Sequence, residues 1–416
     1  MKKYTVLSLD PMYSPLHEKI ANIVATKKYA VASCWAMKVY LPSFKFSLAT
    51  KIIKENKQTI TDELLHKIRE LDSYHAAYVK KVEGRNLKKY ELKYMATYYL
   101  ALKQFIVKRK IDLVLLHNDT RWYHAIAVML CKELNIKYLV TEQGLIRPNT
   151  TVIDSHGINF KSNLPAFKVA QESKENFIAK HPHDSLISMG IFGIFLLIFM
   201  LEKVLKTQIN YFHNDYSFAK YYKRITNKFK QKKNEEKKGV VSKQSVLLLL
   251  QLELDSQLLI YSEFANNQEL ISKLESKCKE KGLEFAVKKP PLDCKIYQVS
   301  EDTIFVDGVV SKLSQQAKMV FTVNSSAALQ VMKTSTPLYL LGDSLYNKPY
   351  VATKVDINSF DFDELDKIEI KKSYRDDFLN IINYNYLLHG AGFSFNNDLL
   401  KAKLKELLCE PGISCG

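Results

Sequence analysis

The sequence predicts an α/β protein of two Rossmann-like domains, with a helical and basic insertion between them and a helical C-terminus. Three observations predict this class. A chain of 416 residues is too long for one ordinary hydrophobic core. Apolar strand-like runs alternate with helical patterns in both halves of the chain. A basic segment with few acidic residues separates the two halves.

The first domain is expected over residues 1–184. It opens with the strand "YTVLSL", an apolar run too short for a signal peptide. A helix over "SPLHEKIANIVATKKY" follows, with Ser14 as N-cap and Pro15 at the first helical position, and "YAVASCW" is the next strand. Helical patterns fill residues 58–109. The order strand, helix, strand in "IDLVLLHND", "WYHAIAVMLCKELN" and "IKYLVTEQG" then indicates a parallel β-α-β unit.

The insertion is expected over residues 185–244. Its run "ISMGIFGIFLLIFML", Ile187 to Leu201, carries no charge but is shorter than the ~20 residues of a spanning helix. From Lys220 to Lys243 ten residues are basic and two are acidic. The apolar run is therefore either a helix buried between domains or a helix lying in a membrane interface. The basic neighbour favours the interface, although such a run also suits a solvated linker.

The second domain is expected over residues 245–360. The strands "SVLLLLQLEL", "LEFAVKK", "DTIFVDG", "KMVFTV" and "PLYLLGD" alternate with helical patterns, the last of which is "NSSAALQVMKTS". Strands that are apolar on both faces are typical of parallel sheets covered by helices on both sides. C-terminal helices are expected over residues 361–416. Two such domains joined by a linker describe a GT-B-type architecture, and neither GxGxxG nor GxxxxGK[ST] is present.

Charge and cysteine content restrict the partners and the compartment. Lys and Arg exceed Asp and Glu by 61 − 44 = 17, which favours polyanionic partners such as anionic lipid, acidic sugars or nucleic acid. No nucleic-acid-binding module is recognisable, and the excess is concentrated beside the apolar run, so no nucleic-acid partner is expected. The six Cys are scattered without metal-ligand spacing, which is typical of reduced thiols in a cytosolic protein.

Polar residues follow four of the predicted strands, where open α/β sheets bind ligands. Each group also has an ordinary interpretation, as a helix cap or a solvated lysine pair. A helix start rich in Ser and Asn has the clearest chemistry, because its free backbone N–H groups bind phosphate. The four groups are Glu142; Gln251 to Asp255; Lys288 and Lys289; and Asn324, Ser325 and Ser326.

As an ordered set these motifs resemble the capsular polysaccharide synthesis family of bacterial β-Kdo transferases. The set reads Glu-x-Gly-x-x-Arg-Pro, Gln-x-x-x-Asp, a lysine strand end and a Ser-rich helix start, and the similarity runs from about Asp112 to Lys348. Its best parts are "TEQGLIRPNTTVIDSHGIN" and "VNSSAALQVMKTSTPLYLLGDSLYNKP". The resemblance implies a GT-B-type fold and CMP-activated Kdo as the donor substrate, with no cofactor. No metal is implied, because the sequence has no Asp-x-Asp pair at a suitable strand end. The Asp-containing stretch "SFDFDELD" is interpreted as a helix start.

The resemblance also implies a role for each motif. Asp255 would attack the anomeric carbon of the sugar, so that retention proceeds by two displacements. Glu142 would act as general acid/base for the acceptor hydroxyl, and Arg147 would bind substrate. The nucleotide and its phosphate would be held by Gln251, Lys288, Lys289, Asn324, Ser325 and Ser326. The chain departs from the family's Lys-x-His-Pro motif, because Pro290 stands at the histidine position. The neighbouring Lys289 would have to take the role of that histidine.

The expected function is therefore transfer of a 2-keto sugar acid from a CMP-sugar to a lipid-linked or oligosaccharide acceptor in capsule or lipopolysaccharide synthesis. The expected location is the cytoplasmic side of the inner membrane, with the anionic membrane surface and capsule assembly proteins as partners. Two alternatives remain open. One is a sialyl- or polysialyltransferase that uses CMP-sialic acid, and the other is a non-catalytic, membrane-associated component of polysaccharide assembly.

Overall fold

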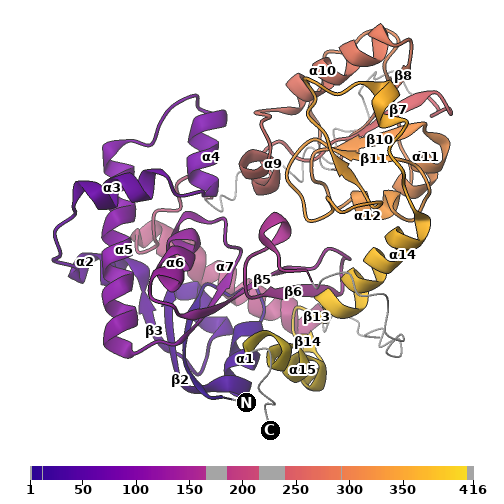
Figure 1. The fold of residues 1–416 in the computed structure, drawn as a ribbon. Helices are drawn as coiled ribbons and strands as arrows, with labels where there is room; N and C mark the ends of the chain where they lie inside the picture. The colour runs from indigo at the N-terminus through magenta and orange to yellow at the C-terminus, as the bar shows by residue number, and fades with distance from the viewer. Residues whose placement is uncertain (1, 12, 165–184, 215–238, 292, 410–416) are drawn as a thin grey trace.

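A computed structural model describes residues 2–11, 13–164, 185–214, 239–291 and 293–409 of the chain. Two α/β domains stand side by side, each built on its own sheet (Figure 1). The predicted α/β class with two Rossmann-like domains is confirmed. Most of the predicted basic run, up to residue 238, lies outside the described residues.

The N-terminal sheet has eight strands in the order β14-β13-β6-β5-β4-β1-β2-β3. The five strands from β5 to β3 are parallel, whereas β6 and the two C-terminal strands add in antiparallel fashion. Leu113 to Leu116 are fully buried, as the continuous apolar run predicted. The bounds are β1 (Tyr4–Leu9), β2 (Ala25–Ala32), β3 (Lys45–Leu48), β4 (Leu113–His117), β5 (Lys137–Gln143), β6 (Thr150–Asp154), β13 (Leu387–Ala391) and β14 (Ser394–Phe395).

The N-terminal helices differ from the prediction mainly at their ends. The first helix stops at Val24, earlier than the prediction, because Ala25 already pairs with Tyr4 of β1 and strand pairing overrides the helical pattern. Thr61 and Ser73 each cap a helix, so the helical region predicted over residues 58–109 is divided into separate helices. The helices are α1 (Leu16–Val24), α2 (Ala49–Glu55), α3 (Asp62–Arg69), α4 (Tyr74–Lys81), α5 (Lys89–Arg109) and α6 (Trp122–Glu133).

The second sheet is parallel throughout, with six strands in the order β12-β11-β10-β7-β8-β9. The order places β7 in the middle, so the loop after it lies over the centre of the sheet edge. Its strands are β7 (Ser245–Leu249), β8 (Glu284–Lys288), β9 (Ile304–Phe305), β10 (Met319–Thr322), β11 (Leu338–Leu340) and β12 (Thr353–Lys354). Its helices are α9 (Ser256–Tyr261), α10 (Asn267–Glu280), α11 (Val310–Gln316) and α12 (Ala328–Val331).

The C-terminal segment returns to the first domain (Figure 1). It runs through α13 (Phe362–Leu365), α14 (Lys372–Asn380), a π-helix (Ile381–Tyr386), β13, β14 and α15 (Asn397–Leu408). The helices were predicted, and Asp361 caps α13 as the helix-start interpretation of "SFDFDELD" required. The strands were not predicted, because "LLHGA" is short and contains two residues that disfavour strands. Pairing of Leu387 with Val152 decides their conformation.

Arg375 is buried on α14, and no carboxylate among the described residues pairs with it. Its Nε donates to the carbonyl of Val351, and its Nη1 donates to those of Thr334 at 2.9 Å and Thr336 at 2.7 Å. Burial lowers the pKa of its guanidinium to about 10. The side chain thus satisfies three buried carbonyls between α14 and the C-terminal sheet.

Arg375→Ala is expected to lower the free energy of unfolding by about 3–5 kcal/mol, because it leaves those carbonyls without donors. Urea unfolding followed by circular dichroism measures this change. Arg69→Ala, which removes an exposed arginine from the end of α3 in the other domain, serves as a comparison for loss of an arginine. A change below about 1 kcal/mol at Arg375 would contradict the structural role assigned to it.

The apolar run of the insertion forms α7 (Ser185–Leu205), which is longer than its uncharged stretch. Among the described residues it is the one helix long and apolar enough to cross a bilayer, over Leu186–Leu205 with a mean hydropathy of 2.0. Cys34, Cys131 and Cys278 are free thiols, in line with the prediction. Cys409 is disulfide-bonded, which the scattered spacing did not predict.

Candidate functional site

A cavity of about 790 Å³ lies between the two domains at the carboxyl ends of both parallel sheets. Open α/β sheets bind ligands at this edge, and a volume of this size suits a nucleotide sugar. Each residue predicted for the site from the sequence lines this cavity. They are Glu142, Arg147, Gln251, Asp255, Lys288, Lys289, Asn324, Ser325 and Ser326.

Glu142 stands near the end of β5 and presents its carboxylate to the cavity from the first domain. Its Oε2 accepts from the Asn118 side chain at 2.8 Å, and its Oε1 accepts from the backbone N–H of Gln143 at 2.9 Å. Burial raises the pKa of the Glu142 carboxyl, and these hydrogen bonds and Arg121 offset part of that rise. A carboxyl in this environment can hold and release a proton closer to neutral pH than an exposed glutamate.

Asp255 presents its carboxylate from the second domain. It is the N-cap of α9, where its Oδ1 accepts from the backbone N–H of Gln257 at 2.8 Å. The capping interpretation is therefore correct, and Asp255 also lines the cavity. Asp255 is exposed at the open cleft, yet desolvation by the surrounding protein raises the pKa of its carboxyl, and the negative charge of Glu142 adds to that rise. The two carboxylates are thus near enough to interact across the cleft.

Arg147 supplies positive charge to both carboxylates. Its guanidinium counteracts the raised pKa of Asp255 and also that of Glu142. Within the described part of the chain its side chain makes no hydrogen bond or ion pair that would occupy its donors. A guanidinium of this kind can bind a carboxylate or phosphate through two parallel hydrogen bonds.

Gln251 and Asn324 bind each other at the edge of the second sheet. The Gln251 amide donates to Oδ1 of Asn324 at 2.9 Å, and the Asn324 amide donates to the carbonyls of Gln257 and Asp343. These bonds join the loops after β7, β10 and β11. Both amides therefore shape the cavity wall, and most of their hydrogen-bonding capacity is used within the protein.

The predicted phosphate-binding helix start is shorter than the sequence pattern indicated. The helix after Asn324 is the single turn α12. A helix this short has a small dipole, which contributes little to phosphate binding. The Ser325 hydroxyl accepts from the backbone N–H of Ala327 at 3.2 Å, and Ser326 is exposed to the cavity. What remains available for a phosphate is the two hydroxyl groups and the loop backbone.

The two lysines at the end of β8 differ in their contacts. Lys289 donates to the carbonyl of Lys295 at 2.6 Å and lies over the Tyr297 ring, so its ammonium is engaged away from the cavity centre. Lys288 makes no side-chain hydrogen bond or ion pair within the described residues. Lys288 is consequently the better candidate for an anion ligand, whereas Lys289 lines the cavity with its ammonium already bound to the Lys295 carbonyl.

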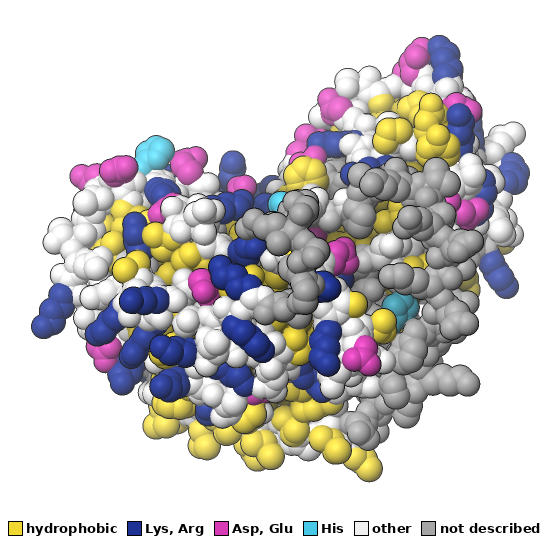
Figure 2. Space-filling view, turned by 60° about the horizontal axis from the view of Figure 1, so that its bottom comes forward, with side chains coloured by type: hydrophobic (Ala, Val, Ile, Leu, Met, Phe, Trp, Pro, Cys, Tyr) yellow, Lys and Arg dark blue, Asp and Glu magenta, His cyan; other side chains and the backbone are white. Residues whose placement is uncertain are grey.

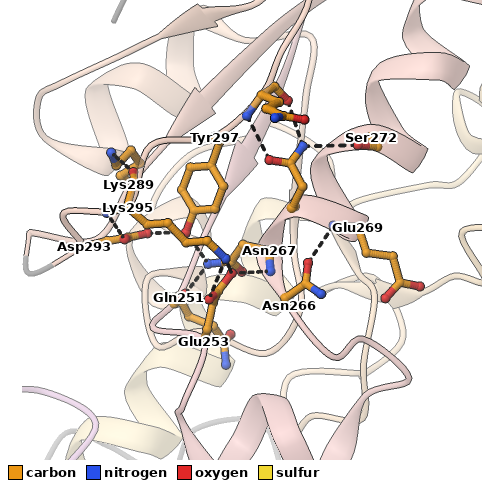
Figure 3. A network of polar contacts seen from close by, with 12 residues as sticks. Gln251, Glu253, Asn266, Asn267, Glu269, Ser272, Lys289, Asp293, Lys295 and Tyr297 are labelled. Carbon is orange, nitrogen blue, oxygen red and sulfur yellow. Dashed lines mark hydrogen bonds and ion pairs between the residues drawn. The ribbon is translucent and has the colours of Figure 1, made fainter. Parts of the chain in front are cut away.

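A polar network holds the loop that carries Asp255 (Figure 3). Lys295 donates to both carboxylate oxygens of Glu253 at 2.9 and 3.1 Å, and Glu253 also accepts from the backbone N–H of Asn267. The Asn267 amide donates to the carbonyl of Gln251 at 2.8 Å and to the Tyr297 hydroxyl at 3.1 Å. The loop after β7 is thereby fixed to α10 and to the loop after β8.

Tyr74 of α4 links the loop after β4 to the loop that carries Asp255, across the domain boundary. Its backbone N–H donates to the carbonyl of Thr120 at 2.7 Å, and its hydroxyl donates to the carbonyl of Leu254 at 3.2 Å. Thr120 in turn donates to Asn118, the partner of Glu142. One continuous series of hydrogen bonds therefore relates the position of Glu142 to that of the Asp255 loop.

Sequence reasoning missed several residues of the cavity wall, including Asn118, Asn159 and Tyr346. Asn118 adopts a left-handed backbone with φ of 61°, a conformation that asparagine tolerates better than most residues. The signal that could have found it is its place directly after β4, in "HND", at the same sheet edge as Glu142. Tyr346 comes from the "GDSLYNKP" loop and joins the site only through the tertiary fold.

Two facing α/β domains with the site between the carboxyl ends of their sheets define a GT-B-like protein. Residues 112–387 match the family described as "Capsule polysaccharide biosynthesis protein". Because the match covers more than half of the chain, the protein belongs to this capsule polysaccharide biosynthesis family. The predicted resemblance is confirmed at this level.

Individual relatives have names from capsule synthesis and export. The chain is 22% identical over 265 residues to the capsule polysaccharide export protein KpsS of Escherichia coli, covering 57% of this chain and 68% of that protein. Among solved structures, KpsC β-Kdo 2,7 transferase of Thermosulfurimonas dismutans aligns at 12% identity over 80% of this chain and 96% of its own, with a TM-score of 0.35. The β-Kdo 2,4 transferase of the same KpsC aligns at 14% identity over 67% and 81%, with a TM-score of 0.36.

Proposed function

We propose that this protein is a glycosyltransferase that moves a 2-keto sugar acid, β-Kdo, from CMP-Kdo to a glycolipid or polysaccharide acceptor during capsule synthesis. The observation that carries the proposal is the pair of carboxylates, Glu142 and Asp255. They face one interdomain cavity from opposite domains, both with a raised pKa and with Arg147 near them. The family match over residues 112–387 supports the biological context.

In the proposed reaction the donor lies against the second domain. The Asp255 carboxylate attacks the anomeric carbon, the bond from that carbon to the CMP phosphate oxygen breaks, and CMP leaves with the bonding electrons. Lys288 and the hydroxyls of Ser325 and Ser326 stabilise the phosphate. Arg147 binds the carboxylate of the sugar acid through its planar pair of N–H donors.

The second displacement transfers the sugar to the acceptor. Glu142 accepts the proton of the acceptor hydroxyl. At the same time the acceptor oxygen attacks the anomeric carbon, and the bond between that carbon and Asp255 breaks. Two inversions give net retention. The donor is made in the cytosol and the acceptor is lipid-linked, so the proposed place of action is the cytoplasmic face of the inner membrane. CMP-sialic acid, the other 2-keto acid donor, would use the same groups.

One observation favours a second candidate, a non-catalytic component of polysaccharide assembly. Pro290 stands where the family's motif has histidine, and Lys289 is engaged by the Lys295 carbonyl. A donor to the leaving phosphate is therefore missing at that point. Under this candidate the cavity would bind nucleotide weakly or not at all.

Calorimetric titration with CMP, UMP, GMP and AMP, without metal, tests the proposal. We expect selective CMP binding that Lys288→Ala weakens about tenfold or more, because a charge-assisted contact to the phosphate is lost. Ser325→Ala is expected to weaken it less. Lys367→Ala, which removes an exposed lysine from the same domain, should leave CMP binding unchanged.

The opposite result is equally informative. If none of the four nucleotides binds to a folded protein, the transferase proposal fails and the assembly component becomes the preferred function. Selective binding of UMP or AMP would instead exclude a CMP-sugar donor. Thermal unfolding of each variant confirms that it is folded before its titration is compared.

A further inference from the structure

The helix α7 has one stripe buried in the protein and a second apolar stripe in solvent. Phe195 and Phe199 are 3% and 2% exposed, and Phe195 packs on the rings of Tyr13 and Tyr40 at 5.2 and 5.9 Å. On the opposite side five large apolar residues, spaced three, four or seven apart, are more than half exposed: Ile187, Ile194, Leu197, Leu201 and Val204. The helix α7 is therefore neither wholly buried nor separate from the domain.

Contacts at its C-terminal end hold α7 flat against the first domain. Glu202 is buried, and its two carboxylate oxygens accept from the backbone N–H groups of Trp35 and Ala36 at the start of η1 (Trp35–Tyr40). Further on, the Ile209 N–H donates to the carbonyl of Ser33. A helix crossing a bilayer would have to break these bonds, withdraw two phenylalanines from the core and place Glu202 in hydrocarbon.

Basic residues lie near the C-terminal end of α7. Lys203 and Lys206 lie at the end of α7, and Lys51 and Lys54 lie on α2, whose Thr50 hydroxyl donates to the carbonyl of Thr207. Figure 2 shows hydrophobic side chains gathered along the lower edge of the molecule, with many Lys and Arg side chains above them. Apolar residues in contact with lipid chains and lysines at headgroup level are the pattern of a helix that lies in a membrane interface.

We propose that α7 binds the surface of an anionic phospholipid bilayer through its exposed stripe, lying in the plane of the membrane. A row of large apolar side chains in water, beside lysines, fits lipid better than a soluble protein partner. The apolar side chains match the lipid acyl chains, and the lysines match the anionic headgroups. This surface is specific to the α7 insertion. It does not follow from the cavity or from the carboxylates.

The position of α7 gives this binding a consequence for the proposed transferase, on which this step rests. Its contacts at Ser33, Trp35 and Tyr13 are just past the carboxyl ends of β2 and β1, and Glu142 is at the same edge on β5. β5 and β2 are three strand spacings apart in the sheet, roughly 15 Å. Membrane binding by α7 would therefore bring a lipid-linked acceptor to the side of the cavity that holds Glu142.

Vesicle co-sedimentation of the full chain tests the inference. We expect binding to vesicles of phosphatidylglycerol and phosphatidylethanolamine, and weaker binding to phosphatidylcholine alone. The double variant Leu197→Gln/Leu201→Gln should lower the bound fraction at least about tenfold, because two leucines no longer enter the lipid. As a matched control, Ile296→Gln/Val309→Gln changes two similarly exposed apolar residues of the other domain and should bind like the wild type.

Two outcomes would overturn the inference. In one, the wild type binds neither vesicle type but forms a dimer that the double variant Leu197→Gln/Leu201→Gln dissociates. That result would assign the stripe to contact with a second copy of the chain. In the other, the double variant binds vesicles as well as the wild type. CMP titration of the same variants separates this result from the fate of the transferase proposal, since α7 substitutions should leave CMP binding unchanged. Vesicle binding without CMP binding would uphold only the membrane inference.

Discussion

Asp255→Asn is expected to lower sugar transfer by about 10³-fold or more while leaving the protein folded and able to bind CMP. An amide cannot act as the nucleophile that displaces CMP, so the first displacement stops. Asparagine is as good an N-cap as aspartate, and its carbonyl oxygen can still accept from the Gln257 N–H. The substitution therefore removes the chemistry without removing the cap.

The measurement is CMP release from CMP-Kdo, together with intact-protein mass spectrometry after a short reaction. The wild type should show an added mass of one Kdo residue, and Asp255→Asn should show none. Asp361→Asn provides the matched control, because Asp361 also caps a helix of the second domain but lies outside the cavity. Full activity of Asp255→Asn would remove Asp255 from the mechanism and would leave the cap as its only role.

Glu142→Gln is expected to slow transfer to the acceptor by about 10²–10⁴-fold, because no base remains to accept the acceptor proton. The first displacement does not need that proton transfer in the proposed reaction. The glycosyl adduct on Asp255 should therefore accumulate in this variant and be visible by mass spectrometry. Loss of transfer without adduct accumulation would place Glu142 in the first step instead, and unchanged transfer would exclude it as the base.

The raised pKa of Glu142 also predicts two pH effects. As a base it must be ionised, so wild-type transfer should fall with decreasing pH at values above the ordinary glutamate pKa of 4.5, and Glu142→Gln should lack this limb. The effect on the free energy of unfolding has the opposite pH dependence. A carboxyl with a raised folded-state pKa stabilises the fold fully below 4.5, and this contribution is lost as the pH rises through the folded-state pKa.

Thermal unfolding between pH 4 and 8 measures the second effect. The stability loss with rising pH should be smaller in Glu142→Gln than in the wild type, since the amide does not ionise. Glu55→Gln changes an exposed glutamate of the same domain and should keep the wild-type pH dependence. An identical pH dependence in the wild type and both variants would contradict a raised pKa at Glu142.

The sequence by itself determined the class of fold and identified nine of the residues that line the interdomain cavity. The buried strands before Glu142 and Gln251 are continuous apolar runs followed by polar residues, and a parallel strand leaves such residues at the ligand-binding edge. For that reason the four motifs could be placed at the carboxyl ends of strands before their contacts were known. The apolar run of α7 was likewise identifiable from its composition alone.

The tertiary structure decided what those residues contact, because hydrogen-bond partners distant in the sequence are not encoded in local patterns. It engages Lys289 with the Lys295 carbonyl, binds Gln251 to Asn324, and reduces the expected helix after Ser326 to one turn. It also brings the unpredicted β13 back to the first domain, since pairing with β6 outweighs a weak local preference. Only the packing of Phe195 and Phe199 determined that α7 is held on the first domain by one narrow stripe, while most of its surface remains exposed to bind a partner surface.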